Sequence, residues 1–274
     1  MLTVIPEQLY NEACSIVEDD SWVRYGGFDW DEMLENASTI KTLTAYMRSC
    51  YCPKLGKGSG RIAYLVKPGS KAGDGLTVDG PACFKIAKNM KGVAQNKAET
   101  KYLESLKKYS FAPIIYNSND AGLFILVEAG TPVKGARSKK VMDYFKDWND
   151  WAFDNGFVDL GEDNNVNVSI NNAAGRAPND NFFDGFLSDL YFAADSENKK
   201  AVFAMLKEMV DDLPKYKPIY DFVIWLYGEN AAHDLEVLDF VEPSNWAFVK
   251  RDNQEVLIPI DFGYTNEVRD TYYK

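Results

Sequence analysis

Pro259-Ile260-Asp261-Phe262-Gly263 closes an apolar, strand-like run near the end of the sequence. Asp-Phe-Gly after such a run is one way in which proteins present a carboxylate to nucleotide-bound magnesium. An aspartate at the end of a strand is also a common turn former, so the triplet alone does not choose between a metal ligand and a turn. The segments upstream of the triplet decide between the two interpretations.

Upstream, the first half of the chain changes from helical to strand-like periodicity. Helical spacing of apolar residues covers 6–19 and 29–49, and in the second segment it involves Leu34, Ile40, Leu43 and Met47. Strand-like runs follow at 61–66, 82–87, 114–117 and 123–128. A helix is predicted between the second and third runs, over 93–109, so these elements form one compact unit.

The second half is mainly helical and returns to strands just before the triplet. Helical periodicity marks 138–155, 182–213 and 219–230, and the polar stretch 159–181 is predicted to be a loop. Short strands are predicted at 237–238, 246–249 and 256–260. The pattern predicts an α+β protein with a helical N-terminal extension (1–52), a β-rich unit (53–130) and a helix-rich unit (131–274) that ends in a hairpin.

Composition places the chain in the globular class. The 274 residues are 46% hydrophobic, which allows one large core or two smaller ones. No apolar run of about 18 residues is present, and the N-terminus lacks the features of a signal peptide, so we expect a cytoplasmic protein without a membrane span. The net charge of −11 disfavours direct nucleic-acid binding, because phosphate contacts require surplus lysine and arginine. A basic partner, simple solubility or imitation of nucleic acid would each explain the acidity.

The cysteines and the single histidine give no sign of a zinc site. Cys14, Cys50, Cys52 and Cys83 lack CxxC spacing, and His233 is the one histidine. We therefore expect reduced thiols in or near the core rather than a disulfide framework.

A glycine cluster precedes the first predicted strand. Gly56, Gly58 and Gly60 would let backbone amides approach a polyphosphate without interference from Cβ atoms. A flexible hairpin turn is the alternative explanation. The cluster is not a Walker loop, because no GxxxxGK[ST] pattern is present.

Lys85 lies inside the apolar run 82–87, where an unpaired ammonium group would be costly. Glu99 lies on the helix that follows and can pair with Lys85, which would hold the amine toward nucleotide phosphates. Glu104 is a rival partner. The lysine could instead extend its amine to water from a strand edge.

Polar side chains flank the terminal hairpin. Asn245 and Asp261 offer the oxygen ligands that Mg²⁺ prefers, with phosphates and water completing the coordination. Asp239, on the predicted strand that leads into this region, is the candidate catalytic base or positioning group for an incoming hydroxyl. Residues 243–245 could also be only a turn, and Asp239 only a strand-end carboxylate. The glycine loop, Lys85, Glu99, Asn245 and Asp261 together are less readily explained by chance than any one of them.

These motifs and their order along the chain resemble those of the protein-kinase-like superfamily. Within that superfamily, they resemble those of divergent kinases encoded by tailed bacteriophages. The similar segments are LGKGSGRIAYLVKP (55–68), FKIAKN (84–89) and AQNKAETKYL (94–103), and the resemblance extends over 53–132 and 233–265. It implies a bilobal fold with ATP between the lobes and a hinge at 127–130, where Glu128 and Gly130 would contact adenine through their backbone. It also implies that Lys85 and Asp239 are catalytic and that Asn245 and Asp261 hold magnesium.

Three features depart from that family. Arg61 stands where the family has a glycine, and Asp239 and Asn245 are six residues apart rather than five, with no His-Arg before the aspartate. The loop therefore either contains a one-residue bulge or places Phe240 in the catalytic position. The eleven residues after Gly263 leave no room for an activation segment or for the usual C-terminal helices.

The resemblance implies an ATP- and Mg²⁺-dependent phosphotransferase that modifies serine or threonine hydroxyls of host proteins during phage infection. A pseudokinase-like inhibitor of a host factor is one alternative. A small-molecule kinase of the aminoglycoside-phosphotransferase kind is another. The sequence identifies neither the substrate nor the oligomeric state.

Overall fold

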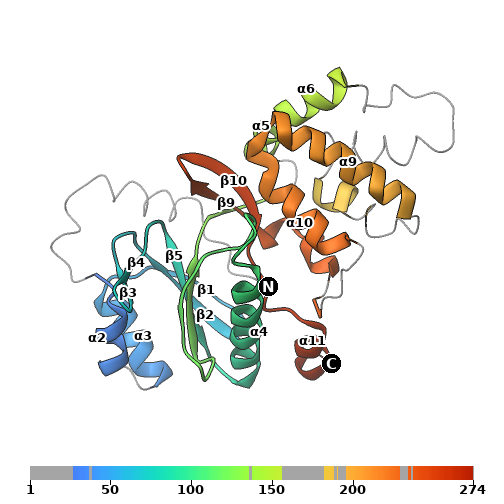
Figure 1. Cartoon of the computed structure of the whole chain (residues 1–274). Coiled ribbons are helices and arrows are strands. Elements are labelled where there is room, and N and C mark those ends of the chain that lie inside the picture. The colour runs from blue at the N-terminus through green and yellow to red at the C-terminus, as the bar shows by residue number, and fades with distance from the viewer. Residues whose placement is uncertain are drawn as a thin grey trace.

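The computed structural model describes residues 27–36, 39–135, 138–155, 182–187, 190, 196–228, 234–235 and 237–273. Over these residues the protein is a mixed α+β structure, as predicted (Figure 1). Three sequence-based predictions lie outside the described residues: the helix at 6–19, the loop at 159–181 and the reduced state of Cys14. No described helix is both long enough and apolar enough to cross a membrane.

A five-stranded antiparallel sheet forms the first part of the molecule, with strand order β1-β2-β5-β7-β6. Its strands are β1 (Lys54–Lys57), β2 (Arg61–Val66), β5 (Ala82–Ala87), β6 (Ile115–Ser118) and β7 (Phe124–Glu128). The predicted runs at 61–66 and 82–87 are confirmed; the run predicted at 114–117 is shifted by one residue, and the run predicted at 123–128 starts one residue later. The sequence patterns did not reveal β1 or the small hairpin of β3 (Lys71–Gly73) and β4 (Leu76–Thr77).

Helices cover both faces of this sheet, which explains why β5 is buried along its whole length (Figure 1). One face packs against α2 (Trp30–Asn36) and α3 (Ile40–Ser49), where Phe28 and Trp30 contact the rings of Phe84 and Phe124. The other face packs against α4 (Met90–Leu106). Helix α4 begins three residues before the predicted start because the Asn89 side chain caps it by accepting from the Gly92 N–H.

The helical segment 29–49 is interrupted. A capping box formed by Thr39 and Thr42 starts α3 as a separate helix. The interruption changes which apolar positions face the sheet: Leu43 and Met47 are buried, whereas Leu34 and Ile40 are exposed.

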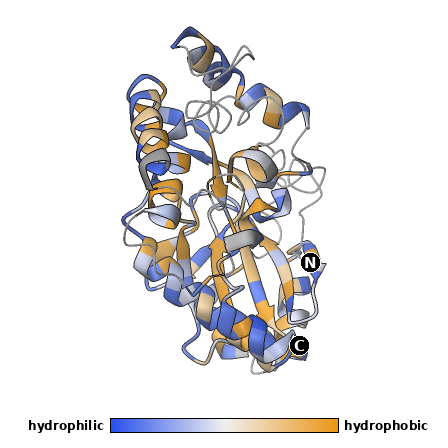
Figure 2. Cartoon of the chain, turned by 90° about the vertical axis from the view of Figure 1, so that its right-hand side faces the viewer, coloured by the Kyte–Doolittle hydropathy of each residue, from blue (hydrophilic) through white to orange (hydrophobic). Residues whose placement is uncertain are grey.

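The second part of the molecule is a set of helices around an aromatic core. These elements are α5 (Lys139–Tyr144), α6 (Lys146–Asp154), a π-helix (Phe182–Leu187), α9 (Ser196–Asp212) and α10 (Lys217–Tyr227). The single helix predicted over 138–155 is two helices, since α6 starts anew at Lys146. Orange and blue segments alternate along the helices of the molecule (Figure 2), as expected for helices with one apolar face, and apolar residues of these helices are buried. The largest buried rings are those of Trp148, Phe182, Phe186, Tyr216, Phe222 and Trp246.

The predicted terminal hairpin is present as β9 (Trp246–Arg251) and β10 (Gln254–Pro259), with β8 (Thr131–Pro132) as a third strand. Asp252 and Asn253 make its turn with positive φ angles of 49° and 61°, as two-residue hairpin loops of type I′ require. Asp261 follows β10 after one intervening residue, Ile260. The short helix α11 (Asn266–Tyr272) then starts at Thr265, whose side chain accepts from the Val268 N–H; the sequence patterns did not predict it.

The predicted strand at 237–238 is wrong, because this segment belongs to a 3₁₀ helix, η5 (Val237–Val241). Its backbone is satisfied locally rather than by a neighbouring strand. The Asp239 carbonyl accepts from the Glu242 N–H at 3.3 Å and from the Asn245 side-chain amide at 2.6 Å. Asp239 is therefore presented from a tight helical turn.

Candidate functional site

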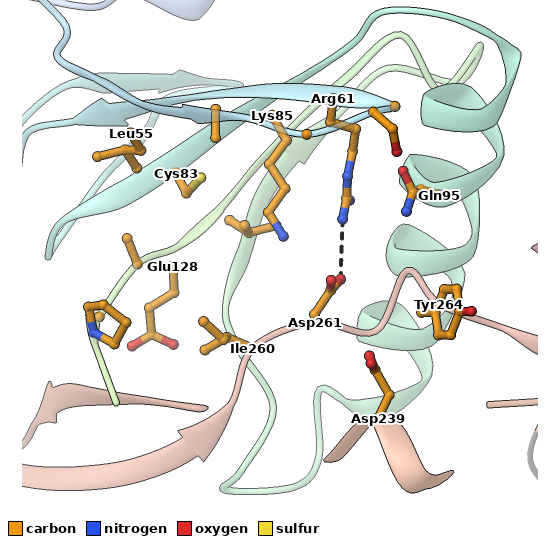
Figure 3. Close-up of a pocket in the computed structure, with 18 of the residues that line it drawn as sticks. Leu55, Arg61, Cys83, Lys85, Gln95, Glu128, Asp239, Ile260, Asp261 and Tyr264 are labelled. Carbon is orange, nitrogen blue, oxygen red and sulfur yellow. Dashed lines mark hydrogen bonds and ion pairs between the residues drawn. The ribbon is translucent and has the colours of Figure 1, made fainter. Parts of the chain in front are cut away.

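A cavity of about 300 Å³ lies between the five-stranded sheet and the segment that carries Asp239 and Asp261 (Figure 3). One part of its wall is apolar and another is charged. The apolar wall includes Leu55, Ala63, Cys83, Val127, Pro132 and Ile260, and the charged wall includes Arg61, Lys85, Asp239 and Asp261. The partly buried Tyr264 and the exposed Tyr273 complete the rim with Gln95.

Two glycines of the cluster, Gly58 and Gly60, lie in the turn between β1 and β2, whereas Gly56 lies in β1, and the turn is tied to the start of α4. Gly58 and Gly60 line the cavity, and Gly56 is not among the lining residues. Lys88 Nζ donates to the Gly58 carbonyl at 2.7 Å, and Asn89 Nδ2 donates to the Ser59 carbonyl at 3.1 Å. The turn is thus anchored over the cavity by the residues that begin α4.

Close packing between this turn and α4 requires glycine at position 92 and leaves little room for a side chain at position 60. A Cβ atom at Gly92 would lie 2.1 Å from the Gly60 carbonyl oxygen, and one at Gly60 would lie 2.5 Å from Gln95 Oε1. Because the first of these contacts is with backbone, it cannot be relieved by moving a side chain.

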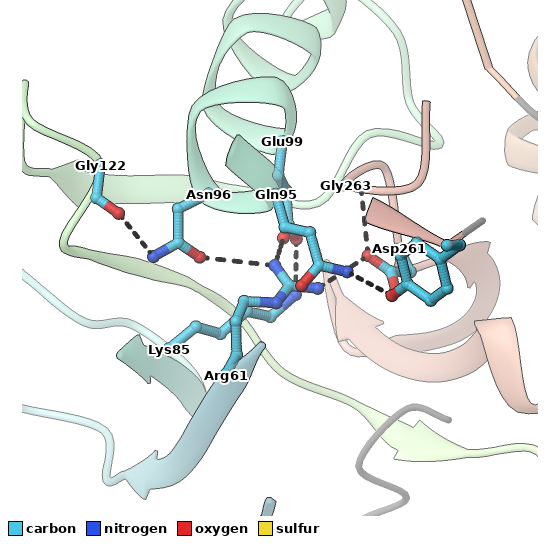
Figure 4. Close-up of polar contacts among 9 residues, drawn as sticks. Arg61, Lys85, Gln95, Asn96, Glu99, Gly122, Asp261 and Gly263 are labelled. Carbon is cyan, nitrogen blue, oxygen red and sulfur yellow. Dashed lines mark hydrogen bonds and ion pairs between the residues drawn. The ribbon is translucent and has the colours of Figure 1, made fainter. Parts of the chain in front are cut away.

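The expected ion pair between Lys85 and Glu99 is present (Figure 4). Lys85 Nζ lies 2.5 Å from Glu99 Oε1, and both side chains are buried. Glu104, the rival partner, pairs with Lys107 on the surface instead. A buried ammonium group that loses its carboxylate partner is left as an uncompensated charge, which is strongly destabilising. Glu99 therefore fixes the position of the Lys85 amine at the cavity wall.

Arg61 joins this pair and extends it to Asp261. Its Nη1 lies 2.5 Å from Glu99 Oε2, and its Nη2 lies 3.2 Å from Asp261 Oδ1. The sequence patterns identified Arg61 only as a departure from the kinase glycine motif. The available signal was an arginine at the start of a buried strand, which requires carboxylate partners.

Asp261 is ionised in this environment. Burial raises the pKa of its carboxyl, but the opposing effects of Arg61 and Lys85 are larger together and hold that pKa below its usual value. The Gly263 N–H also donates to Asp261 Oδ1, at 3.2 Å. The other oxygen, Oδ2, has no hydrogen-bond partner among the described residues, and the side chain lines the cavity.

Asp239 points toward the same part of the cavity as Asp261 (Figure 3). Two main effects raise the pKa of Asp239 to about 7: the larger is desolvation by burial, and the smaller is the negative charge of Asp261. Asn245 is almost fully buried, is not among the lining residues, and donates from Nδ2 to the Asp239 carbonyl. The structure therefore brings Asp239 and Asp261 together and keeps Asn245 outside the cavity wall.

The predicted hinge residues Glu128 and Gly130 both line the cavity. The Glu128 N–H donates to the Ile114 carbonyl at 2.7 Å, and the Ala129 N–H donates to the Pro81 carbonyl at 2.8 Å. The Glu128 carboxylate is engaged by Arg251 at 2.5 Å. Backbone recognition of a ligand by this segment would therefore use its carbonyl groups or the Gly130 amide.

The donor set on the cavity fits magnesium when phosphate is also present. Among the described residues, no three His, Cys, Asp or Glu side chains converge to hold a metal ion by themselves. Mg²⁺ typically binds one or two carboxylates and takes its remaining ligands from phosphates and water. Asp261 Oδ2 and the Asp239 carboxylate are oxygen donors of this kind.

Comparisons with known proteins do not add to this description. No protein-family model, no curated protein and no solved structure matches the chain. A function for the cavity is therefore to be inferred from the residues that form it.

Proposed function

We propose that the chain is an ATP- and Mg²⁺-dependent phosphotransferase with a bilobal, protein-kinase-like fold. The observation that supports this most is the meeting of Lys85, Asp239 and Asp261 on one cavity beneath the glycine turn. These residues come from three separate parts of the sequence. The proposed acceptor is a serine or threonine hydroxyl of a host protein in the host cytoplasm, as for the phage kinases that the motifs resemble.

The two walls of the cavity suit the two ends of a nucleoside triphosphate. The apolar wall from Leu55 to Val127 would accept the base, with backbone contacts from Glu128 and Gly130. Phosphates would lie under Gly58 and Gly60, where backbone groups can approach closely. The cavity volume of about 300 Å³ is at the lower end of the range for small-molecule sites.

Each charged residue has a distinct role in this proposal. Lys85, held by Glu99, would contact the phosphates. Magnesium on Asp261 would neutralise charge on the transferred phosphoryl group. Asp239 would accept the proton of the attacking hydroxyl as its oxygen bonds to phosphorus and ADP leaves. Asn245 would act indirectly, by fixing the turn that carries Asp239.

Incorporation of labelled phosphate from ATP, into the chain itself or a host extract, tests the proposal. We expect Lys85→Met and Asp261→Asn to lower incorporation at least 100-fold, since each removes a charge next to the reacting phosphates. Lys54→Met, at an exposed position of β1 outside the cavity lining, is the matched control and should label like the wild type. Equal labelling of all four proteins would refute the proposal.

The contact between Arg61 and Asp261 favours a second candidate function. An arginine on the metal-binding carboxylate would suit a pseudokinase-like protein that binds nucleotide and inhibits a host factor without transferring phosphate. ATP would then raise the melting temperature by mass action without any incorporation of label. In this case Asp239→Asn should retain inhibition of the host factor.

A further inference from the structure

Arg61 fills a position at which three oxygen-bearing side chains converge (Figure 4). Its guanidinium lies 2.5 Å from Glu99 Oε2, 3.5 Å from Asn96 Oδ1 and 3.2 Å from Asp261 Oδ1. Carboxylate and amide oxygens are also the ligands that bind hard divalent cations. The guanidinium therefore occupies a place whose donor set suits a metal ion.

The oxygens around Arg61 are fixed by other contacts. Asn96 is fully buried and donates its amide to the Gly122 carbonyl at 3.0 Å, which directs its oxygen toward Arg61. Glu99 is held on its other side by Lys85. The Gly263 N–H holds the same oxygen of Asp261 that Arg61 contacts. The position is thus pre-organised for one positive group.

The charges within this buried cluster already balance. Arg61 and Lys85 are the cations, Glu99 and Asp261 are the anions, and all four side chains are at most 10% exposed. A second divalent ion at Asp261 would have to displace the guanidinium or share its oxygen. Asn245, the other residue expected to hold magnesium, is not among the cavity-lining residues, and its side chain is engaged by the carbonyl and the carboxyl of Asp239.

We propose that Arg61 takes the place of one of the two magnesium ions with which protein kinases hold ATP, so that this site binds nucleotide with one divalent cation. That cation would lie on the free Oδ2 of Asp261. The guanidinium supplies the second positive charge from within the chain. Its planar fork can contact a carboxylate and a phosphate together. The inference rests on the proposed nucleotide-binding function.

Titration with Mn²⁺, followed by its electron paramagnetic resonance signal, tests this inference on the full chain. With a non-hydrolysable ATP analogue present, we expect one bound Mn²⁺ per wild-type chain and two per Arg61→Gln chain. Arg61→Lys retains the charge and should still bind one. Arg48→Gln removes an exposed arginine on α3 and is the matched control, with one ion expected.

A second series without nucleotide separates this inference from the proposed function. Removal of the guanidinium leaves Glu99 and Asp261 facing each other, so Arg61→Gln should bind Mn²⁺ at least tenfold more tightly than the wild type. Suppose that the wild type fails to bind the ATP analogue while Arg61→Gln still shows the tenfold gain in Mn²⁺ affinity. In that case the proposed function fails and the role of Arg61 as a substitute cation stands.

Two results would overturn the inference. The first is two Mn²⁺ ions per wild-type chain with the analogue bound, a result that does not depend on any variant folding. The second is unchanged Mn²⁺ affinity and stoichiometry in Arg61→Gln, provided that its circular dichroism spectrum matches that of the wild type.

Discussion

Asp239 is the cavity carboxylate whose charge changes near neutral pH. Burial and the neighbouring Asp261 raise its pKa to about 7. A carboxylate that accepts a proton must be ionised, and the ionised form predominates above this pKa. We therefore expect kcat/KM for phosphate transfer to rise with pH and to level off above about 7, because kcat/KM reports the titration of the free enzyme.

The pH profile of the wild-type chain checks this expectation, and Asp239→Asn provides the comparison. The variant should lose about 10²- to 10⁴-fold in kcat, the usual contribution of general base catalysis. Glu104→Gln removes an exposed carboxylate that pairs with Lys107 on the surface, away from the cavity lining, and should keep the wild-type profile. A flat profile in the wild type would contradict the role given to Asp239.

Individual site residues differ in how far the sequence could identify them. Lys85 stood out because an ammonium group inside an apolar strand requires a partner, and Glu99 lay on the next helix. Arg61 was noted only as a departure from the glycine motif, because the run 61–66 that it begins does not by itself show which carboxylates the arginine meets. The orientation of Asn245 depends on a backbone carbonyl six residues earlier, at Asp239, and no sequence pattern specifies that contact.

At the scale of elements, the site depends on contact between the glycine turn and the first turn of α4. Gly92→Ala should weaken ATP binding at least tenfold, because its Cβ would collide with the Gly60 carbonyl and displace the turn. Helix propensity alone predicts the opposite effect on stability, a gain of about 1 kcal/mol for alanine over glycine. Isothermal titration with ATP and Mg²⁺ measures the loss.

Gly80→Ala is the matched control for this substitution. No atom lies within 4 Å of a Cβ atom placed there, and its φ angle is not positive, so affinity should be unchanged. Wild-type affinity in Gly92→Ala would show that the close packing of the turn on α4 does not matter for binding.

The predicted strands of the five-stranded sheet lie within one residue of their observed bounds, whereas the helices predicted over 29–49 and 138–155 are each two helices, and these differences have physical causes. The runs at β2 and β5 are apolar on both faces because helices cover both sides of the sheet. The residues at 237–238 are apolar as well, but a run of two cannot distinguish a strand from a buried helical turn. The interruption between α2 and α3 follows from the threonine capping box, a signal that apolar periodicity overlooks.

At the scale of the whole molecule, Arg251 connects the terminal hairpin to the sheet. It contacts the Glu128 carboxylate at 2.5 Å and the Ala112 carbonyl at 2.7 Å, and it also donates to the Ser110 carbonyl. Arg251→Gln would leave the buried Glu128 carboxylate without its cation. We expect the free energy of unfolding to fall by about 3 kcal/mol, as measured by urea denaturation.

Lys250→Gln tests whether that loss is specific. Lys250 is the exposed neighbour of Arg251 on β9, and its substitution should change the free energy of unfolding by less than about 0.5 kcal/mol. Equal effects of the two substitutions would mean that the hairpin is held by its apolar face rather than by Arg251.

Each of the two cavity carboxylates is followed in the chain by a residue of the aromatic core. Phe240 and Phe262 come directly after Asp239 and Asp261, and their ring centroids are 5.6 Å apart. Trp246 donates to the Phe240 carbonyl at 2.8 Å, and the Trp225 ring lies 6.2 Å from Phe262. The cavity thus has its own optical reporter: a ligand that shifts either carboxylate will alter tryptophan emission, and occupancy can be followed without a dye.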